Sequence, residues 1–344
     1  MDDSLSESLG RGLRTDLSAR LGIAVPVVQA PVGSAAAPGL AAAVSAAGGL
    51  GMLALTWSGA GRARDGVRAV RRRTHRPFGV NLVLDFPVDD ILAVCLQETV
   101  PVVSTFWGDP ASVSRRIRDA GALHMHTVGS VPEALHAAAC GVDVIVAQGW
   151  EAGGHVRGTT TTMVLVPAVA DAVHPIPVMA AGGIADGRGV AAALALGAQG
   201  VWLGTRFLTA TQARTHPRYR ERLLAAGADD TVHTRCFDGG WPGAPHRALR
   251  NTTVQRWEAA GCPPAPGRPG EGDVLTVDDE GRPHRRYEDL IPLPGMTGDV
   301  ADMALYAGQS VALVRDIRPA ESLVSELTAQ TLDVIAGLRR TARP

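Results

Sequence analysis

Val142-Asp-Val-Ile-Val-Ala-Gln-Gly-Trp-Glu-Ala-Gly-Gly-His-Val-Arg-Gly158 is the stretch around which this chain is organised. Its apolar first part, residues 142–146, predicts a buried strand. The glycines that follow relax the backbone, so that a flat ligand can approach it closely. The loop carries one titratable imidazole, His155, and a strand that ends in such a loop is typical of an active-site edge. Taken alone, the stretch fits a plain turn with a surface histidine equally well.

The surrounding chain repeats a short apolar segment followed by a helix-like segment. The apolar runs are continuous rather than alternating, as in strands of a parallel sheet that are buried on both faces. Eight such units predict an α/β fold, the (β/α)8 TIM barrel, and an open doubly wound sheet is the alternative. No G-x-G-x-x-G follows the first strand, which weakens a dinucleotide-binding form of that alternative. The predicted strands are 25–30, 50–55, 78–82, 100–106, 122–128, 142–148, 177–182 and 200–207, and the predicted helices are 1–20, 38–47, 62–73, 110–120, 131–140, 162–173 and 187–196.

The pattern changes after Thr209. Residues 219–226 predict another helix, whereas residues 229–286 lose periodicity and are rich in Gly and Pro, which indicates a long excursion or a small cap packed on the barrel. Residues 322–340 predict an amphipathic helix that docks on the main body. We therefore expect a barrel in residues 1–225, a cap or insertion in 226–300, and C-terminal helices in 301–344 that return to the barrel.

The composition is that of a globular chain. Of 344 residues, 46% are hydrophobic and 19% charged, and no apolar run reaches the roughly 18–20 residues of a membrane span. The N-terminus is acidic and polar rather than a secretory signal, so a cytoplasmic location is expected. A net charge of −1 argues against nucleic acid as a partner.

Cysteine and lysine usage exclude further classes. The four cysteines show no C-x-x-C spacing and predict neither a zinc site nor a disulfide framework, so we expect no metal. All 33 basic residues are arginine. Schiff-base chemistry and the P-loop both require a lysine amine, which excludes them.

Two glycine-containing segments at the ends of the seventh and eighth predicted strands indicate a phosphate site. They are Ala180-Ala-Gly-Gly-Ile-Ala-Asp-Gly and Leu203-Gly-Thr-Arg-Phe. Barrels of this kind often hold a phosphate between these two loops and a helix N-terminus, and Thr205 adds a hydroxyl. The alternative is that the glycines only allow tight turns.

Five ordered motifs carry a resemblance to a known family. Together they resemble the nitronate monooxygenase family, formerly called 2-nitropropane dioxygenases, from about residue 20 to residue 225. The similarity resumes at Tyr306-Ala-Gly-Gln-Ser and Asp316-Ile-Arg-Pro. The motifs are Val28-Gln-Ala-Pro-Val-Gly, Gly79-Val-Asn-Leu, Ala147-Gln-Gly-Trp-Glu-Ala-Gly-Gly-His, Ala180-Ala-Gly-Gly-Ile and Leu203-Gly-Thr-Arg-Phe.

The resemblance implies an FMN-binding TIM barrel with a smaller domain closing over the flavin. The family often has methionine where this chain has Val32, beside the isoalloxazine ring. The phosphate would be held by Gly182, Gly183, Gly204 and Thr205. The remaining implied FMN contacts are Ala30, Pro31 and Val32 at the ring, Asn81, Thr127 and Gln148 toward it, and Gly153, Gly154 and Ala181.

His155 matches the catalytic histidine of the family. An imidazole with a pKa near 6.5 can take the proton from the carbon next to a nitro group. The implied reaction oxidises a nitronate or nitroalkane with O2 to a carbonyl compound and nitrite. A substrate that arrives as nitronate needs no deprotonation, and His155 would then only orient it.

Other functions share these motifs. An NAD(P)H-dependent FMN enoyl-acyl-carrier-protein reductase of the same fold is the main alternative, and a non-catalytic flavin-binding protein is the third. An inosine-monophosphate-dehydrogenase-like enzyme needs a cysteine in the loop of residues 148–161, which has none. Glu151 either orients this loop or His155, or is simply solvated. Substrate size and oligomeric state, monomer or homodimer, stay open.

Overall fold

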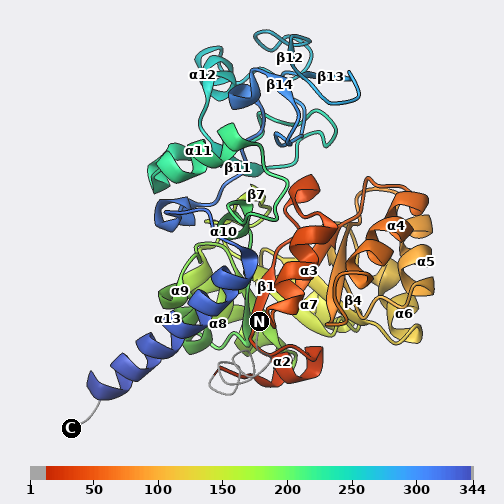
Figure 1. The fold of residues 1–344 in the computed structure, drawn as a ribbon, viewed down its shortest axis with the longest axis vertical. Helices are drawn as coiled ribbons and strands as arrows, with labels where there is room; N and C mark the ends of the chain where they lie inside the picture. The colour runs from red at the N-terminus through yellow and green to blue at the C-terminus, as the bar shows by residue number, and fades with distance from the viewer. Residues whose placement is uncertain (1–12, 342–344) are drawn as a thin grey trace.

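Eight parallel strands form one closed sheet in the computed structural model, which describes residues 13–341 (Figure 1). The strand order is β1-β9-β8-β6-β5-β4-β3-β2, and a parallel bridge between Val28 and Leu50 joins the two ends. This closure confirms the predicted TIM barrel over the open doubly wound sheet. The strands are β1 (Val27–Gln29), β2 (Gly51–Ala54), β3 (Phe78–Val83), β4 (Val102–Phe106), β5 (Leu123–Val128), β6 (Val144–Gln148), β8 (Val178–Ala181) and β9 (Gly200–Leu203).

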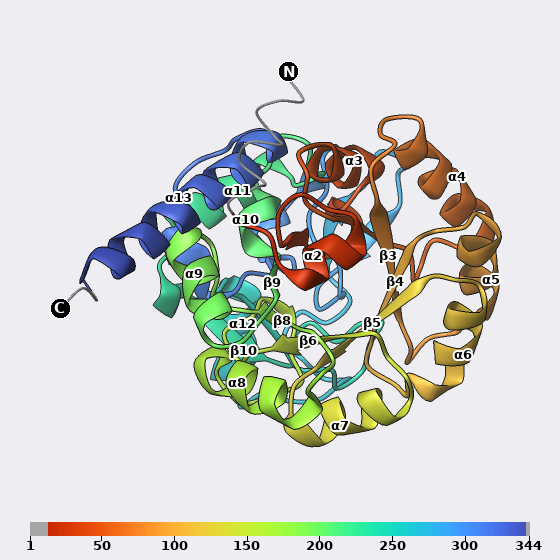
Figure 2. The same cartoon turned by 90° about the horizontal axis from the view of Figure 1, so that it is seen from below.

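Helices alternate with these strands and form the outer ring seen in Figure 2. One of them, α5, was not predicted from the sequence. The eighth strand is also shorter than predicted, because the chain turns into a short helix, α10 (Thr205–Leu208), directly after Gly204. The other helices of the ring are α3 (Pro38–Ala46), α4 (Ala60–Arg71), α5 (Asp89–Gln97), α6 (Ala111–Asp119), α7 (Val131–Ala139), α8 (Thr162–Val173) and α9 (Gly187–Ala195).

A short helix closes the N-terminal end of the barrel. Helix α2 (Asp16–Leu21) lies across the barrel axis in Figure 2, and its Leu17 and Leu21 join the apolar cluster inside the barrel. Trp202 belongs to the same cluster and packs inside the barrel. The predicted lead-in helix of residues 1–20 therefore has its end here, and residues 1–12 lie outside the described part. With this end filled by side chains, the C-terminal ends of the strands are left for the functional site.

The last helix completes the ring. Helix α13 (Ala320–Thr341) packs on α9 and α3, in the gap that follows the eighth strand. Contact is closest at Gly187, where a Cβ would lie 2.4 Å from the backbone nitrogen of Thr331. Its buried residues are in the first half of the helix, whereas Leu338 near the end is 59% exposed, so the predicted apolar face docks only in part.

Residues 217–313 form a layer over the C-terminal ends of the barrel strands, at the top of Figure 1. The unpatterned stretch 229–286 contains regular elements that its sequence did not indicate. Two small antiparallel sheets have the orders β10-β11-β7 and β13-β12-β14, and β7 (Gly154–His155) comes from the loop after β6. The elements are α11 (Pro217–Ala225), β10 (Thr231–Thr234), β11 (His246–Leu249), α12 (Thr252–Ala259), β12 (Val274–Val277), β13 (Pro283–Arg285), β14 (Thr297–Gly298) and the 3-10 turn η4 (Gln309–Leu313).

No helix within residues 13–341 is both long and apolar enough to cross a membrane.

Candidate active site

His155 lies at the seam between the barrel and the layer above it. It belongs to β7 (Gly154–His155), a two-residue strand in the loop after β6. Strand β7 pairs antiparallel with β11, so that His155 is opposite His246. The backbone of Val156 adds a hydrogen bond to the carbonyl of Pro245, at 3.0 Å. A cap strand therefore sets the orientation of a barrel loop.

Aromatic rings surround the imidazole of His155, whose side chain is only 11% exposed. Trp241 is nearly stacked on it, with ring centroids 4.2 Å apart, and Trp107 and Tyr306 present their edges. Burial penalises the charged imidazolium and lowers the pKa of His155 to about 3. The ring is therefore neutral at neutral pH, as a general base must be.

A carboxylate faces this imidazole. Nε2 of His155 is buried without a hydrogen-bond partner among the described residues, and Oδ2 of Asp289 lies 3.6 Å from it. The other oxygen of Asp289 accepts a hydrogen bond from the hydroxyl of Tyr306. Burial is the main cause that raises the pKa of Asp289, and the Tyr306 hydrogen bond opposes it.

His246, the strand partner of His155, has both ring nitrogens in use. Nε2 accepts from the backbone N–H of Phe237 at 3.2 Å, and Nδ1 donates to the carbonyl of Ala244 at 3.0 Å. Burial lowers the pKa of His246 to about 4. His246 is therefore neutral, with both ring nitrogens hydrogen-bonded. Nε2 of His155, in contrast, has no hydrogen-bond partner among the described residues.

Of the roles considered for Glu151, the structure shows that it holds the loop in place. Its carboxylate accepts from the backbone N–H of Thr162 at 2.9 Å and from the Thr162 hydroxyl at 3.0 Å, at the start of α8. Arg247 of the cap adds a second anchor, because its guanidinium donates to the carbonyl of Trp150 at 3.0 Å. The loop around His155 is thus held from the barrel and from the cap.

The polar residues expected at the flavin lie at the C-terminal ends of barrel strands. Gln148 ends β6, and its Nε2 donates to the carbonyl of His155 at 3.1 Å, while its Oε1 is buried with no partner among the described residues. Asn81 in β3 accepts from the Ser104 hydroxyl at 2.5 Å. Thr127 near the end of β5 shares a strand face with the barrel-interior Met125.

The residues expected at the phosphate lie on neighbouring strand ends. Strands β8 and β9 pair in the sheet, which brings Gly182 and Gly183 beside Gly204. Gly182 and Gly183 have φ of +99° and +72°, in the left-handed region that favours glycine. A Cβ on Gly204 would lie 3.4 Å from Val32 and 3.8 Å from Ala30, so the end of β1 adjoins the same place.

The Tyr306-Ala-Gly-Gln-Ser motif locks this region to the cap. The N–H of Gly308 donates to the Thr205 hydroxyl at 2.9 Å, and that of Gln309 to the Glu151 carbonyl at 2.9 Å. A Cβ on Gly153 would lie 2.3 Å from the nitrogen of Gly308. Gly153 is therefore required by a close backbone crossing. Gly154 has φ of +72° and open space around it, which leaves room near the imidazole.

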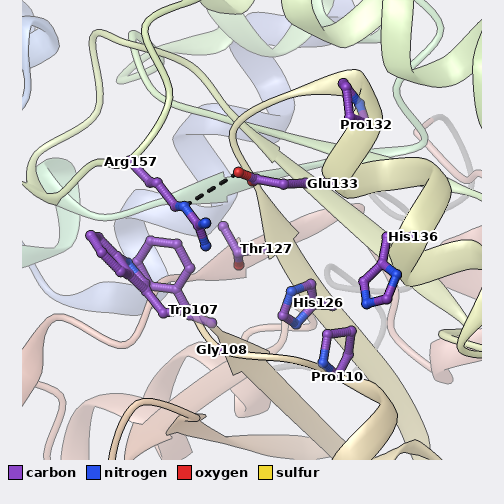
Figure 3. A pocket seen from close by; sticks show the side chains of 10 residues that line it. Trp107, Gly108, Pro110, His126, Thr127, Pro132, Glu133, His136 and Arg157 are labelled. Carbon is purple, nitrogen blue, oxygen red and sulfur yellow. Dashed lines mark ion pairs between the residues drawn. The ribbon is translucent and has the colours of Figure 1, made fainter.

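A pocket of about 280 Å³ opens beside Trp107, between the ends of β4 and β5 and helix α7. In Figure 3, Arg157 reaches over Trp107 toward Glu133, with which it forms an ion pair at 3.3 Å, and Thr127 lies beneath. His126 and His136 are on the far side. The pocket is lined by Phe106, Trp107, Gly108, Pro110, His126, Thr127, Pro132, Glu133, His136 and Arg157.

The two histidines of β5, His124 and His126, connect neighbouring strands of the barrel. The hydroxyl of Thr105 contacts Nε2 of His124 and Nδ1 of His126, each at 2.8 Å. Desolvation lowers the pKa of His124 to about 4 and that of His126 to about 3. They are neutral links between β4 and β5.

One group of possible metal ligands converges within the described residues. Atoms of Asp109, His136 and Cys140 lie within 4.8 Å of one another. The side chains of Asp109 and His136 are 60% and 57% exposed, and they already form a hydrogen bond of 2.9 Å. This arrangement is that of a surface hydrogen bond beside a thiol, and we assign no metal to it.

Sequence reasoning missed Trp107, Asp289 and the role of Tyr306. Trp107 has φ of +58°, an uncommon backbone conformation that is often retained at functional sites. Asp289 follows Tyr287, whose φ is +73°. Neither residue has a sequence signal, because residues 107, 155 and 289 are far apart in the chain and meet only in the tertiary structure. Tyr306 had a signal in its motif but no assigned role.

A buried neutral imidazole and unpaired polar atoms thus lie at the C-terminal end of the barrel, the end at which TIM barrels carry their active sites. The family model described as "Nitronate monooxygenase" matches residues 14–91 and 87–330. The chain belongs to the nitronate monooxygenase family and is a flavin-dependent oxidoreductase.

Individual relatives carry different names. A Mycobacterium tuberculosis protein is 40% identical over 72% of this chain and 69% of its own length; it is named (3aS,4S,5R,7aS)-5-hydroxy-7a-methyl-1-oxo-octahydro-1H-indene-4-carboxyl-CoA dehydrogenase. The structure of FabK from Thermotoga maritima is 32% identical, with a TM-score of 0.81 over 96% of this chain and 99% of that one. The structure of nitroalkane oxidase from Streptomyces ansochromogenes is 32% identical, with a TM-score of 0.77 over 93% and 99%.

Proposed function

We propose that this protein is an FMN-dependent enzyme that oxidises alkyl nitronates or nitroalkanes with O2 to a carbonyl compound and nitrite, with His155 as the base. The observation that carries the proposal is the buried, neutral imidazole of His155, set among aromatic rings at the barrel mouth. The family and the similarity to the nitroalkane oxidase structure support this reaction.

The residues present fit a flavin. The buried Oε1 of Gln148 and Nε1 of Trp107 lack partners among the described residues, and a flavin ring edge offers both donors and acceptors. We assign the ring to Ala30, Pro31, Val32, Asn81, Thr127 and Gln148, and the phosphate to Gly182, Gly183, Gly204 and Thr205, with Gly153, Gly154 and Ala181 as further contacts. When bound, FMN supplies the electron acceptor and the link to O2.

His155 performs the proton transfer. Neutral at pH 7, its imidazole takes the proton from the carbon that bears the nitro group, and the electrons of the broken C–H bond remain on the substrate as the nitronate. The imidazole becomes an imidazolium. Trp107, Trp241 and Tyr306 keep bulk water from the site, which strengthens the attraction between this cation and the new nitronate anion.

An absorbance spectrum of the purified protein, followed by anaerobic titration with a nitronate, tests the proposal. We expect a flavin spectrum, FMN as the released cofactor, and bleaching by the nitronate. Nitrite formation in air should be lost on a nitroalkane, but retained in part on its nitronate, in a His155→Asn variant. Absence of flavin after reconstitution, or an oxidised spectrum at saturating nitronate, contradicts the proposal.

A thioester reductase or dehydrogenase is the second candidate. The relative named as a carboxyl-CoA dehydrogenase, 40% identical to this chain, favours a CoA thioester as substrate. The reductase form, acting on an enoyl thioester with NAD(P)H, predicts rapid anaerobic bleaching of the flavin by NADH or NADPH at low concentration. If NADH or NADPH bleaches the flavin and nitronates do not, the protein is a thioester reductase. For a non-catalytic flavin-binding protein, neither NAD(P)H nor a nitronate should bleach the flavin.

A further inference from the structure

We propose that Asp289 is a positioning residue that acts through His155, holding a proton on Nε2 of the imidazole so that Nδ1 faces the substrate as the base. This inference rests on the proposed function, because it assigns a base role to His155.

The geometry around Nε2 leaves Asp289 as its partner. Nε2 is enclosed and bonded to no described residue, and Oδ2 of Asp289 lies 3.6 Å away. A hydrogen bond needs about 2.7–3.2 Å, so a side-chain movement of about half an ångström closes the gap. Catalytic hydrogen bonds are often long in ligand-free sites and shorten in the complex. Because this nitrogen is enclosed, we take Oδ2 of Asp289 as its acceptor.

The cap holds the carboxylate in place. The backbone N–H of Asp289 donates to the carbonyl of Gly239 at 3.0 Å, and the N–H of Gly239 donates to the carbonyl of Tyr287 at 2.9 Å. These bonds pair segment 239–241 with segment 287–289, which delivers Trp241 and Asp289 together to His155. The hydroxyl of Tyr306 occupies Oδ1 and leaves Oδ2 toward the imidazole.

Burial makes the pair a stronger base than the imidazole alone. Protonation of an isolated buried His155 creates a cation, whereas protonation of the pair with Asp289 ionised removes a buried negative charge. The same burial therefore opposes proton uptake by the ring alone and favours it for the pair. In this proposal the two groups act together as one proton-sharing unit.

Few other charges face the pair. From β11 comes His246, which is neutral and hydrogen-bonded at both nitrogens, and from the segment after η3 (Val300–Asp302) comes Tyr306. Asp85 accepts from Nε1 of Trp241 at 3.2 Å, and Arg157 lies over Trp107, 5.6 Å from its ring centre; each is separated from His155 by an indole ring. Asp289 is thus the carboxylate in contact with the imidazole.

An Asp289→Asn variant tests the role kinetically. The amide keeps the shape but cannot be an anionic acceptor for the Nε2 proton. We expect kcat on a nitroalkane to fall at least about tenfold, because proton abstraction is a step to which general bases contribute about 10²–10⁴-fold. Turnover of the preformed nitronate should stay within about twofold. The pH profile for the nitroalkane should lose the limb that belongs to the base.

Glu288→Gln is the matched control. Glu288 is the next residue in the chain, and its carboxylate accepts from the backbone N–H of Arg285 at 2.8 Å and faces His284, away from His155. It should leave the ratio of nitroalkane to nitronate turnover unchanged. An equal loss on both substrates in Asp289→Asn, or no loss on the nitroalkane, overturns the proposal.

A second measurement does not depend on turnover. Nitrogen-15 NMR of labelled histidine in the flavin-loaded wild-type protein reports which ring nitrogen carries the proton, with His155 assigned by its loss in His155→Asn. We expect the proton on Nε2 of His155. A proton on Nδ1 overturns the role of Asp289, even where Asp289→Asn fails to fold. If the wild-type protein oxidises neither nitroalkane nor nitronate, the proposed function fails, while this spectrum still decides whether the pair exists.

Discussion

The barrel and the layer of residues 217–313 contribute different things to the same site. The barrel strands follow one another at regular intervals, pair with near neighbours in the chain and bury continuous apolar runs. The cap sheets are short and pack on small apolar clusters. Polar contacts also tie their distant segments together, such as Asn251 donating to the carbonyls of Ala301 and Met303. The barrel thus supplies the glycine turns and strand ends assigned to the flavin, whereas the cap surrounds and orients the imidazole. Single substitutions should therefore be able to reduce catalytic turnover without reducing flavin binding, and the reverse.

The largest effect is expected at His155. His155→Asn removes the base and should lower kcat/KM on a nitroalkane by about 10²–10⁴-fold. Flavin content should remain that of the wild type, because the implied FMN contacts come from the barrel. Steady-state kinetics and the bound-flavin spectrum measure both. Loss of flavin together with activity would contradict the division between the two regions.

Gly153→Ala changes the contact between the barrel and the cap. The new Cβ would lie 2.3 Å from the nitrogen of Gly308, so a backbone shift is required, and overpacking of this kind costs about 1–3 kcal/mol. Denaturant unfolding should show this loss. Gly61→Ala, in α4 with open space around it, is the control and should be neutral or stabilising.

Gly182→Ala acts on the barrel side. A side chain at φ of +99° is strained, and the Cβ would lie 3.1 Å from the nitrogen of Ala152. We expect about a tenfold weaker affinity for FMN, corresponding to about 1–2 kcal/mol of backbone strain. Flavin fluorescence titration measures it. Unchanged FMN affinity would argue against Gly182 as a phosphate contact.

Lowering the pH should reduce the stability of both the barrel and the cap. Burial lowers the pKa of His126 to about 3 in the barrel and of His246 to about 4 in the cap, below the ordinary value near 6.5. Between these values the unfolded chain binds protons that the folded chain refuses, so the stability is fully present above about pH 6.5 and is lost as the pH falls toward 4. Urea midpoints from pH 7.5 to 4.5 should fall, and less steeply in His246→Gln. A flat profile would contradict these buried neutral rings.

The smallest effect is expected at Trp241. Trp241→Phe keeps an aromatic ring against His155 but loses the hydrogen bond from Nε1 to Asp85. A typical hydrogen bond contributes about 0.5–1.5 kcal/mol, so the free energy of unfolding should fall by no more than this. Activity should change only a few-fold. A loss near that of His155→Asn would mean that the indole has a part in the chemistry.

The sequence predicted the barrel well and the cap poorly. Continuous apolar runs such as Val144–Ala147 predict buried parallel strands because burial on both faces leaves no place for polar residues. Helix α5 was missed, although its sequence Ile91–Leu96 is apolar, because a short apolar run does not distinguish helix from strand. In the cap, β10 and β11 form because they pair with each other across an intervening loop, and their sequences lack a periodic pattern.

The sequence by itself determined the barrel, the family and the place of His155 at the end of the sixth strand, because local periodicity and short motifs are encoded within a few consecutive residues. Only the tertiary structure decided which groups surround that imidazole. Trp107 comes from the barrel loop after β4, whereas Trp241, Asp289 and Tyr306 come from the cap. The pairing of β7 with β11 and of segment 239–241 with 287–289 brings the cap residues to His155. Burial at that convergence, and not the residue type, places the pKa of His155 below its ordinary value.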